Sequence, residues 1–145
     1  MNFTDPKVAA VFARYDVREQ ADTARMAELG RAAFEIRDEF LLPVGPEVGT
    51  FLHALILARR PQRILELGTS YGYSTLFLAD AARAVGAKVV TMELADYKQA
   101  HARAQLEEAI DEQIDRRVSW HIDRDSAADQ LAAATEHADR MFFWT

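Results

Sequence analysis

Residues 66–75 read Glu66-Leu67-Gly68-Thr69-Ser70-Tyr71-Gly72-Tyr73-Ser74-Thr75. The apolar run from Arg63 to Leu67, which follows Pro61, is typical of a strand buried on both faces. The alanine- and leucine-rich segment from Tyr73 to Val85 predicts a helix that ends at Gly86. The two glycines of the turn therefore lie at the carboxyl end of a buried strand, where α/β sheets open to ligands.

The alternation of strand and helix continues beyond this turn. Predicted strands cover Lys88 to Glu93, Arg117 to Ile122 and Met141 to Trp144, and predicted helices cover Asp96 to Gln113 and Asp125 to Thr135. Such alternation implies a parallel sheet with right-handed crossovers and helices on both faces. The predicted fold class is α/β, with a Rossmann-like parallel sheet.

Two helices are predicted ahead of the first strand. From Asp16 to Leu42 apolar residues recur at spacings of three and four, which indicates one long amphipathic helix that ends before Pro43. Its apolar stripe consists of Met26, Leu29, Ala33, Ile36 and Phe40. We expect the stripe to pack within its own domain, and a contact between subunits is the alternative. A second helix is predicted from Gly45 to about Ala58. Residues 1–60 then form a helical part and residues 61–145 a strand-containing part of one domain.

The composition narrows the class of protein. The 17 Lys and Arg against 23 Asp and Glu give a formal charge of −6 without a long basic stripe, which disfavours a nucleic-acid partner. The chain has no cysteine, so a disulfide framework, thiolate catalysis and cysteine zinc sites are excluded, and we expect a cytoplasmic location. The longest apolar stretch, Phe51 to Ala58, is too short to span a bilayer, so no membrane partner is expected.

The glycine turn indicates which kind of ligand it could bind. Gly68 and Gly72 let the backbone turn sharply and approach a ligand, and the helix that begins near Tyr73 directs N–H groups toward a carboxylate or phosphate. A dinucleotide fingerprint would place glycine where Ser70 stands, and a phosphate-binding P-loop would place lysine where Tyr73 stands. The pattern favours a nucleoside with an amino-acid tail, and a nicotinamide dinucleotide is the less favoured alternative.

The turn resembles a known family. Residues 65–75 are similar to the first motif of the class I S-adenosylmethionine-dependent methyltransferases, in the version of the small-molecule O-methyltransferases of the catechol and caffeoyl-CoA type. The segment Val44 to Leu52 resembles the stretch that precedes this motif in the family. The resemblance implies the N-terminal half of a class I methyltransferase fold, preceded by extra N-terminal helices.

The resemblance implies a role for ten residues in binding S-adenosylmethionine. The methionine part would be bordered by Glu66 and Gly68, by the backbone of Thr69, Ser70, Tyr71 and Gly72, and by Ser74 near the carboxylate. Glu93 would accept the two ribose hydroxyls, which requires a carboxylate, and a solvated strand end is the alternative. Asp125 and Ser126 stand where the family places a residue near the adenine, and capping of the next helix is an equally open role for Asp125.

The resemblance also implies where the acceptor would bind. In the family an acidic residue after the fourth strand helps to hold a divalent metal or the acceptor, and here that position falls on or beyond Thr145. No catalytic residue and no metal ligand is therefore assigned, and a C-terminally truncated chain is expected. The four histidines have no metal-ligand spacing. These are His53, His101, His121 and His137.

The expected function is methyl transfer from S-adenosylmethionine to a hydroxyl of a small molecule, provided that the acceptor part is supplied. The alternative is a non-catalytic cofactor-binding or oligomerisation remnant of the same family. A homo-oligomer is expected because the fourth strand, with Phe142, Phe143 and Trp144, would leave a free apolar edge.

Overall fold

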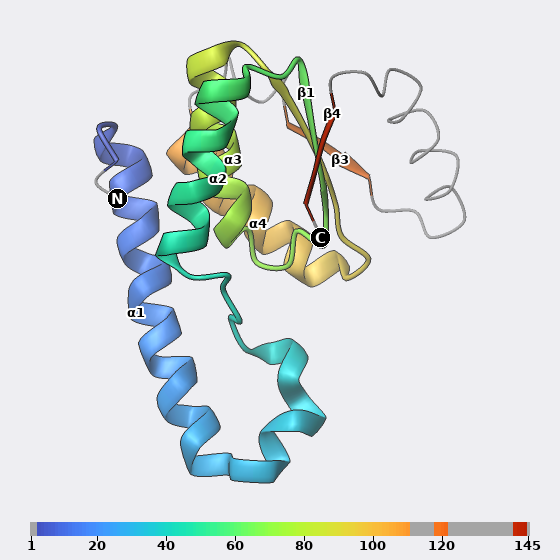
Figure 1. Cartoon of the computed structure of the whole chain (residues 1–145). Helices are drawn as coiled ribbons and strands as arrows, with labels where there is room; N and C mark the ends of the chain where they lie inside the picture. The colour runs from blue at the N-terminus through green and yellow to red at the C-terminus, as the bar shows by residue number, and fades with distance from the viewer. Residues whose placement is uncertain (1–2, 111–117, 122–140, 145) are drawn as a thin grey trace.

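The computed structural model describes residues 3–110, 118–121 and 141–144, and for the last two segments it describes the backbone only. The elements in chain order are α1 (Pro6–Leu29), the 3-10 helix η1 (Gly30–Glu39), α2 (Pro46–Arg59), β1 (Arg63–Leu67), α3 (Tyr73–Val85), β2 (Lys88–Met92), α4 (Asp96–Ala109), β3 (Val118–His121) and β4 (Met141–Trp144). Figure 1 shows α2 and α3 side by side on the same side of the sheet.

The four described strands form one parallel sheet in the order β3-β2-β1-β4. Glu66 on β1 is in register with Thr91 on β2 and with Trp144 on β4. The chain therefore moves outward from β1 to β2 and β3 and then returns to the other side of β1. This reversal places a ligand crevice at the carboxyl end of β1. The predicted α/β, Rossmann-like parallel sheet is confirmed.

The core is built around α3, which contacts β1, β2 and the neighbouring helix α2. Residues 73–79 of α3 are all buried, as are Ile64 and Leu65 of β1. Four aromatic rings from the N-terminus, α1 and α3 pack together at centroid distances of 5.1 to 5.8 Å: Phe3, Phe12, Tyr73 and Phe77. Gly49 permits the close approach of α2, because a Cβ there would lie 2.7 Å from the Phe77 ring.

The predicted helix from Asp16 to Leu42 is wrong in both its start and its continuity. The helix begins at Pro6, where the side chain of Asp5 accepts a hydrogen bond from the Lys7 N–H at 2.8 Å. It ends at Leu29, because Gly30 takes a left-handed φ of 55° and the separate helix η1 follows. The spacing of apolar residues is the same on both sides of this break, so it did not indicate that the chain changes direction at Gly30.

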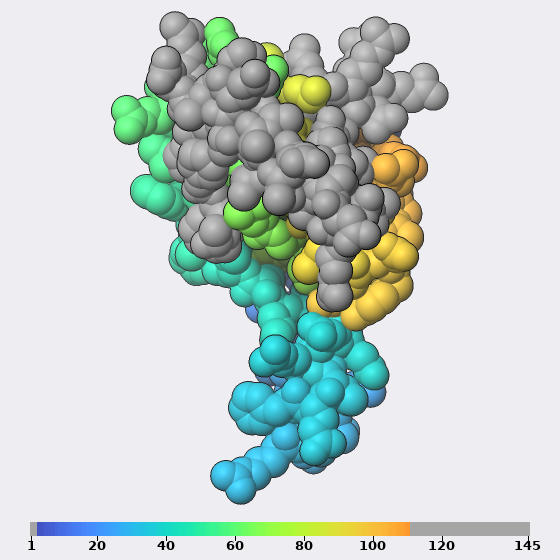
Figure 2. Space-filling model, turned by 90° about the vertical axis from the view of Figure 1, so that its right-hand side faces the viewer, coloured from blue at the N-terminus to red at the C-terminus, as the bar shows by residue number. Residues whose placement is uncertain are grey.

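The second half of α1 and η1, residues 20–39, form a helical arm that extends away from the sheet (Figures 1 and 2). In the predicted stripe Ala33 and Phe40 are buried, whereas Leu29 is 37% exposed. The buried side chains of α1 instead lie in its first half: Val8, Val11 and Tyr15. The packing surface of the N-terminal region is therefore the beginning of α1.

The other predicted boundaries agree closely with the structure where it describes them. Helices α2 and α3 and strands β1 and β4 match their predictions, β2 ends one residue early, and β3 lies within the predicted range. The predicted helix 125–135 and the predicted end of α4 at Gln113 lie outside the described residues. Among the helices of the described segments, none has the length and apolar character needed to cross a membrane.

The contact between Gly49 and Phe77 can be tested by stability measurements. We expect Gly49→Ala to lower the free energy of unfolding by about 1–3 kcal/mol through overpacking, reduced by about 1 kcal/mol through the better helix preference of alanine. The double variant Gly49→Ala/Phe77→Leu should lose less than the sum of the single variants, because the smaller side chain relieves the clash. Urea unfolding measures all four proteins, and a double variant that loses as much stability as the sum of the single variants would contradict a clash between Gly49→Ala and the Phe77 ring.

Candidate active site at the carboxyl end of the first strand

The carboxyl group of Glu66 lies at the centre of a buried network beneath the glycine turn. Its side chain is fully buried, and its oxygens accept hydrogen bonds at 2.6 Å from the hydroxyls of Ser74, Thr75 and Thr91. Burial raises the pKa of Glu66, and the three hydroxyl donors oppose that rise. Since the donors come from α3 and β2, the network joins the end of β1 to both neighbouring elements.

The turn after β1 has a left-handed backbone at three residues, with φ of 88° at Gly68, 48° at Ser70 and 93° at Gly72. At Gly72 space also demands glycine, because a Cβ would lie 2.9 Å from the Tyr15 hydroxyl and 3.0 Å from the Cβ of Ala102. Gly68 differs, since among the described residues no atom lies within 4 Å of the position of its missing Cβ. The backbone at Gly68 is therefore open to a ligand.

Glu93, which directly follows the neighbouring strand β2, holds this turn in place. Its Oε2 accepts a hydrogen bond from the Ser70 N–H at 2.7 Å, and its Oε1 accepts one from the Ala95 N–H at 2.9 Å. A left-handed conformation of a non-glycine residue costs on the order of 1 kcal/mol or more. The bond from Glu93 thus helps to hold Ser70 in a conformation that glycine usually adopts.

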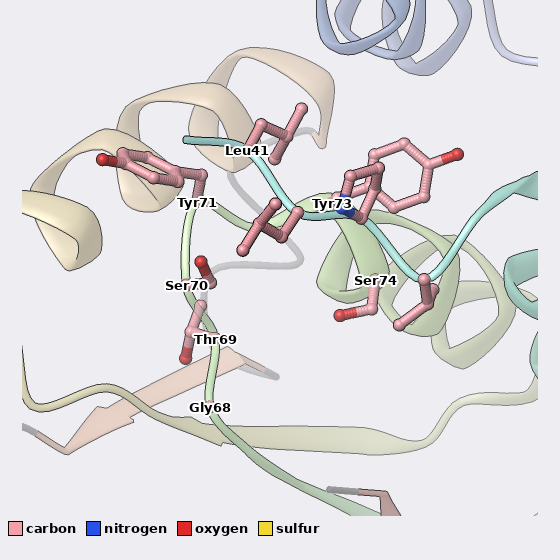
Figure 3. A pocket seen from close by; sticks show the side chains of 10 residues that line it. Leu41, Gly68, Thr69, Ser70, Tyr71, Tyr73 and Ser74 are labelled. Atoms are coloured by element: carbon pink, nitrogen blue, oxygen red, sulfur yellow. The ribbon is translucent and has the colours of Figure 1, made fainter. Parts of the chain in front are cut away.

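A pocket of about 130 Å³ lies between this turn and the segment that leads from η1 to α2. Its lining residues are Leu41, Leu42, Pro43, Val44, Gly68, Thr69, Ser70, Tyr71, Tyr73 and Ser74. In Figure 3 Leu41 lies on one side of the pocket and Gly68 and Thr69 on the other, while the rings of Tyr71 and Tyr73 point in opposite directions. The pocket thus has one polar backbone wall and one apolar wall.

The comparison with protein families shows which kind of domain carries this pocket. A family described as a methyltransferase domain matches residues 65–143, which is more than half of the chain.

The chain belongs to this methyltransferase domain family.

Two solved structures share the fold of this methyltransferase domain. The O-methyltransferase from Bacillus cereus, solved in complex with SAH, is 26% identical with a TM-score of 0.61, and the match covers 94% of this chain and 54% of that protein. The O-methyltransferase TomG from Streptomyces achromogenes, solved in complex with SAM, is 27% identical with a TM-score of 0.55, and the match covers 82% of this chain and 55% of that protein.

A probable O-methyltransferase of Mycobacterium tuberculosis is 38% identical over 78 residues, which are 54% of this chain and 32% of that protein. An O-methyltransferase of Aspergillus hancockii is 37% identical over 60 residues, which are 41% of this chain and 24% of that protein. The chain therefore spans about half the length of the solved relatives and a third or less of these sequence relatives.

The structure brings most of the sequence-predicted residues of this methyltransferase domain together. Those that line the pocket are Gly68, Thr69, Ser70, Tyr71 and Ser74. Glu66 lies beneath the turn, enclosed by hydroxyls, and Gly72 is the last residue of the turn and faces the Tyr15 hydroxyl outside the pocket lining. Glu93 is bonded to the turn outside the pocket lining. The structure does not describe Asp125 and Ser126.

The apolar wall of the pocket, Leu41 to Val44, was missed from the sequence. The prediction placed Leu41 and Leu42 at the end of a long helix, whereas η1 ends at Glu39 and an extended segment follows. Val44 begins the second segment that resembled the family, and this was the one available signal. Within the described part of the chain, no group of three or more His, Asp or Glu side chains is placed to hold a metal ion.

Removal of the buried carboxyl group should destabilise this methyltransferase domain. We expect Glu66→Ala to lower the free energy of unfolding by about 3–5 kcal/mol, because it leaves buried hydroxyls without an acceptor and opens a cavity. Glu66→Gln should lose clearly less, since one oxygen remains for Thr75 and Thr91 while the Ser74 hydroxyl can accept from the amide. Urea unfolding measures both variants, and equal losses in both would refute this account of the network.

A pH-dependent contribution is expected from His101 on α4. Its ring packs edge-on against Tyr71 at a centroid distance of 5.4 Å, and its Nε2 lies 3.4 Å from the Arg18 guanidinium. Burial, and then the charge of Arg18, lower the pKa of His101 below its ordinary value of 6.5. The unfolded chain then binds the proton more readily, so the stabilisation is present above pH 6.5 and is lost as the pH falls through the lowered pKa.

We therefore expect the parent protein to lose more stability than His101→Gln when the pH is lowered from about 7.5 to 5.5, because glutamine accepts from Arg18 without titrating. Thermal unfolding across this range measures the difference. Parallel curves for the two proteins would show that His101 does not titrate as described.

Proposed function

We propose that this chain binds S-adenosylmethionine at the Gly68 to Gly72 turn, and that it serves the transfer of a methyl group to a hydroxyl of a small molecule. The observation that carries the proposal is the turn itself. It has an open backbone at Gly68, lies at the crevice beside β1, and is bonded to the carboxylate of Glu93. The solved relatives in complex with SAH and SAM support the same ligand class.

The residues present fit the methionine end of this cofactor. Nothing among the described residues fills the space beside Gly68, and the first turn of α3 has no side-chain cap at Gly72, so its N–H groups suit a carboxylate. The pocket of about 130 Å³ is smaller than the roughly 300–1,000 Å³ of typical ligand sites. It therefore accommodates one end of such a ligand.

Glu93 is proposed to accept the ribose hydroxyls. Each carboxylate oxygen has more than one lone pair, so the bonds to Ser70 and Ala95 leave acceptor capacity. Ser74 is proposed to lie near the cofactor carboxylate, and Asp125 and Ser126 near the adenine. When bound, the cofactor supplies an electrophilic methyl group on a sulfonium. The chain's own residues bind and orient it, and we assign no proton-accepting residue.

We further propose that the helical part, residues 1–60, and residues 61–145 form one cofactor-binding domain. We also propose that the protein is homo-oligomeric and cytoplasmic and that its acceptor is a small molecule. Contacts of α2 with α3 and of α1 with α4 support the single domain. Exposed aromatic side chains, Phe34 at 77% and Phe51 at 64%, favour association and also support the second candidate, a non-catalytic cofactor-binding or oligomerising module. Light scattering tests the association, and a stable monomer at micromolar concentration would count against it.

Titration calorimetry with S-adenosylhomocysteine tests cofactor binding. The parent chain should bind, and Glu93→Gln should bind about tenfold more weakly or worse, because hydrogen bonds to a charged group contribute about 1.5–3 kcal/mol. Glu107→Gln is the matched control: it removes the same charge at an exposed position of α4, away from the turn, and should leave the affinity unchanged. Absence of binding heat and of thermal stabilisation in the parent chain would overturn the proposal, and stabilisation by NAD alone would favour the dinucleotide alternative.

A further inference from the structure

We propose that Tyr71 is a positioning residue that couples the cofactor turn to the apolar wall of the pocket, Leu41 to Val44. This inference rests on the proposed function, since it assumes that the turn receives the cofactor. Tyr71 is the residue between the left-handed Ser70 and Gly72, and its side chain is directed away from the turn (Figure 3). Its hydroxyl reaches the end of η1.

The backbone and the side chain of Tyr71 bind two different helices. Its carbonyl oxygen accepts a buried hydrogen bond of 2.6 Å from the Tyr15 hydroxyl of α1. Its own hydroxyl donates to the carbonyl oxygens of Asp38 at 2.9 Å and Glu39 at 3.3 Å, at the end of η1. Tyr71 therefore binds both α1, at Tyr15, and the C-terminal end of η1, at Asp38 and Glu39.

Two cations strengthen the same connection. The guanidinium carbon of Arg18 lies 3.7 Å from the centroid of the Tyr71 ring, and the Lys98 ammonium lies 5.7 Å from it. Both cations also bind the end of η1, Arg18 through the Glu39 carbonyl at 3.1 Å and Lys98 through the Asp38 carboxylate at 3.1 Å. Each cation therefore contacts both the Tyr71 ring and the end of η1.

The connection extends directly into the pocket wall. Arg18 pairs with Asp22 at 3.3 Å, and the same carboxylate oxygen of Asp22 accepts a hydrogen bond of 2.7 Å from the Leu41 N–H. Leu41 is the first residue of the apolar wall. The path from Tyr71 through Arg18 and Asp22 to Leu41 is thus continuous at contact distance.

The coupling that we propose acts in both directions, as thermodynamic linkage requires. A ligand that favours one orientation of the Ser70 to Gly72 backbone also favours the arrangement in which Tyr71 holds Asp38 and Glu39, and an ordered wall favours ligand binding to the same degree. The wall, which lines the same pocket as the turn, is therefore expected to become more protected when the cofactor binds.

The chain offers a conservative variant and a matched control. Tyr71→Phe removes the hydroxyl and keeps the ring under Arg18. Tyr97→Phe removes a hydroxyl directed at the same Asp38 carbonyl, but at 3.4 Å and from a side chain that is 57% exposed. Arg18→Lys keeps the charge and loses the planar group that stacks on the ring and reaches the carbonyl.

The experiment measures S-adenosylhomocysteine affinity by calorimetry and amide hydrogen exchange of residues 38–44 with and without that ligand. In the parent protein and in Tyr97→Phe we expect ligand to slow exchange of this segment. In Tyr71→Phe and Arg18→Lys we expect affinity to fall about tenfold and the ligand-dependent protection to shrink, while exchange in β1 and α3 stays unchanged. A role confined to stability would change exchange throughout the molecule and leave the ligand-dependent difference intact.

Parental affinity together with parental protection in Tyr71→Phe would overturn the proposal. If the parent protein shows no binding, the proposed function fails by itself, and the ligand-free data still test the contact. Faster exchange of residues 38–44 in Tyr71→Phe than in Tyr97→Phe then supports positioning by Tyr71, and equal exchange contradicts it.

Discussion

The buried carboxyl group of Glu66 is the constraint on which the rest of the site depends. A carboxyl group with no exposed surface is acceptable in a sheet only if its oxygens have donors, and Ser74, Thr75 and Thr91 provide them. These donors fix where α3 begins relative to β1 and β2. The turn between β1 and α3 then has little freedom in its path, which accounts for its left-handed residues.

The end of the neighbouring strand β2 also restrains the turn through hydrogen bonds. The carbonyl oxygen of Met92 accepts hydrogen bonds from the N–H groups of Gly68 and Thr69, and Glu93 accepts one from Ser70. The turn is therefore attached to the end of β2 by three donors in succession. A backbone prepared in this way loses little entropy when a ligand binds, which is the general advantage of preorganised sites.

Local signals explain why most of the fold could be predicted from the sequence. Helix α3 ends at Gly86, α2 begins at Pro46, and the apolar run before Gly68 forms a single strand. Each of these boundaries is determined by one or two residues. The arm could not be predicted in this way, because the apolar spacing continues past Gly30 while the position of η1 depends on Tyr71, Arg18 and Lys98. The pocket wall from Leu41 to Val44 was missed because it follows η1, whose position depends on these tertiary contacts. The burial of Glu66 among three hydroxyls is also a tertiary arrangement, which the sequence motif around Glu66 does not indicate.

The docking of α1 has a consequence for the order of folding. Tyr15 binds the backbone of Tyr71, and Arg14 binds Gln105 and Glu108, so these three partners of the helix are made between 56 and 94 residues later in the chain. During synthesis α1 emerges before these partners, with Val8, Val11 and Tyr15 uncovered, and these sites of attachment do not yet exist. Contacts of such high sequence separation close late because of their loop entropy. This helix therefore docks fully only after α3 and α4 have been made, and until then its apolar face is uncovered.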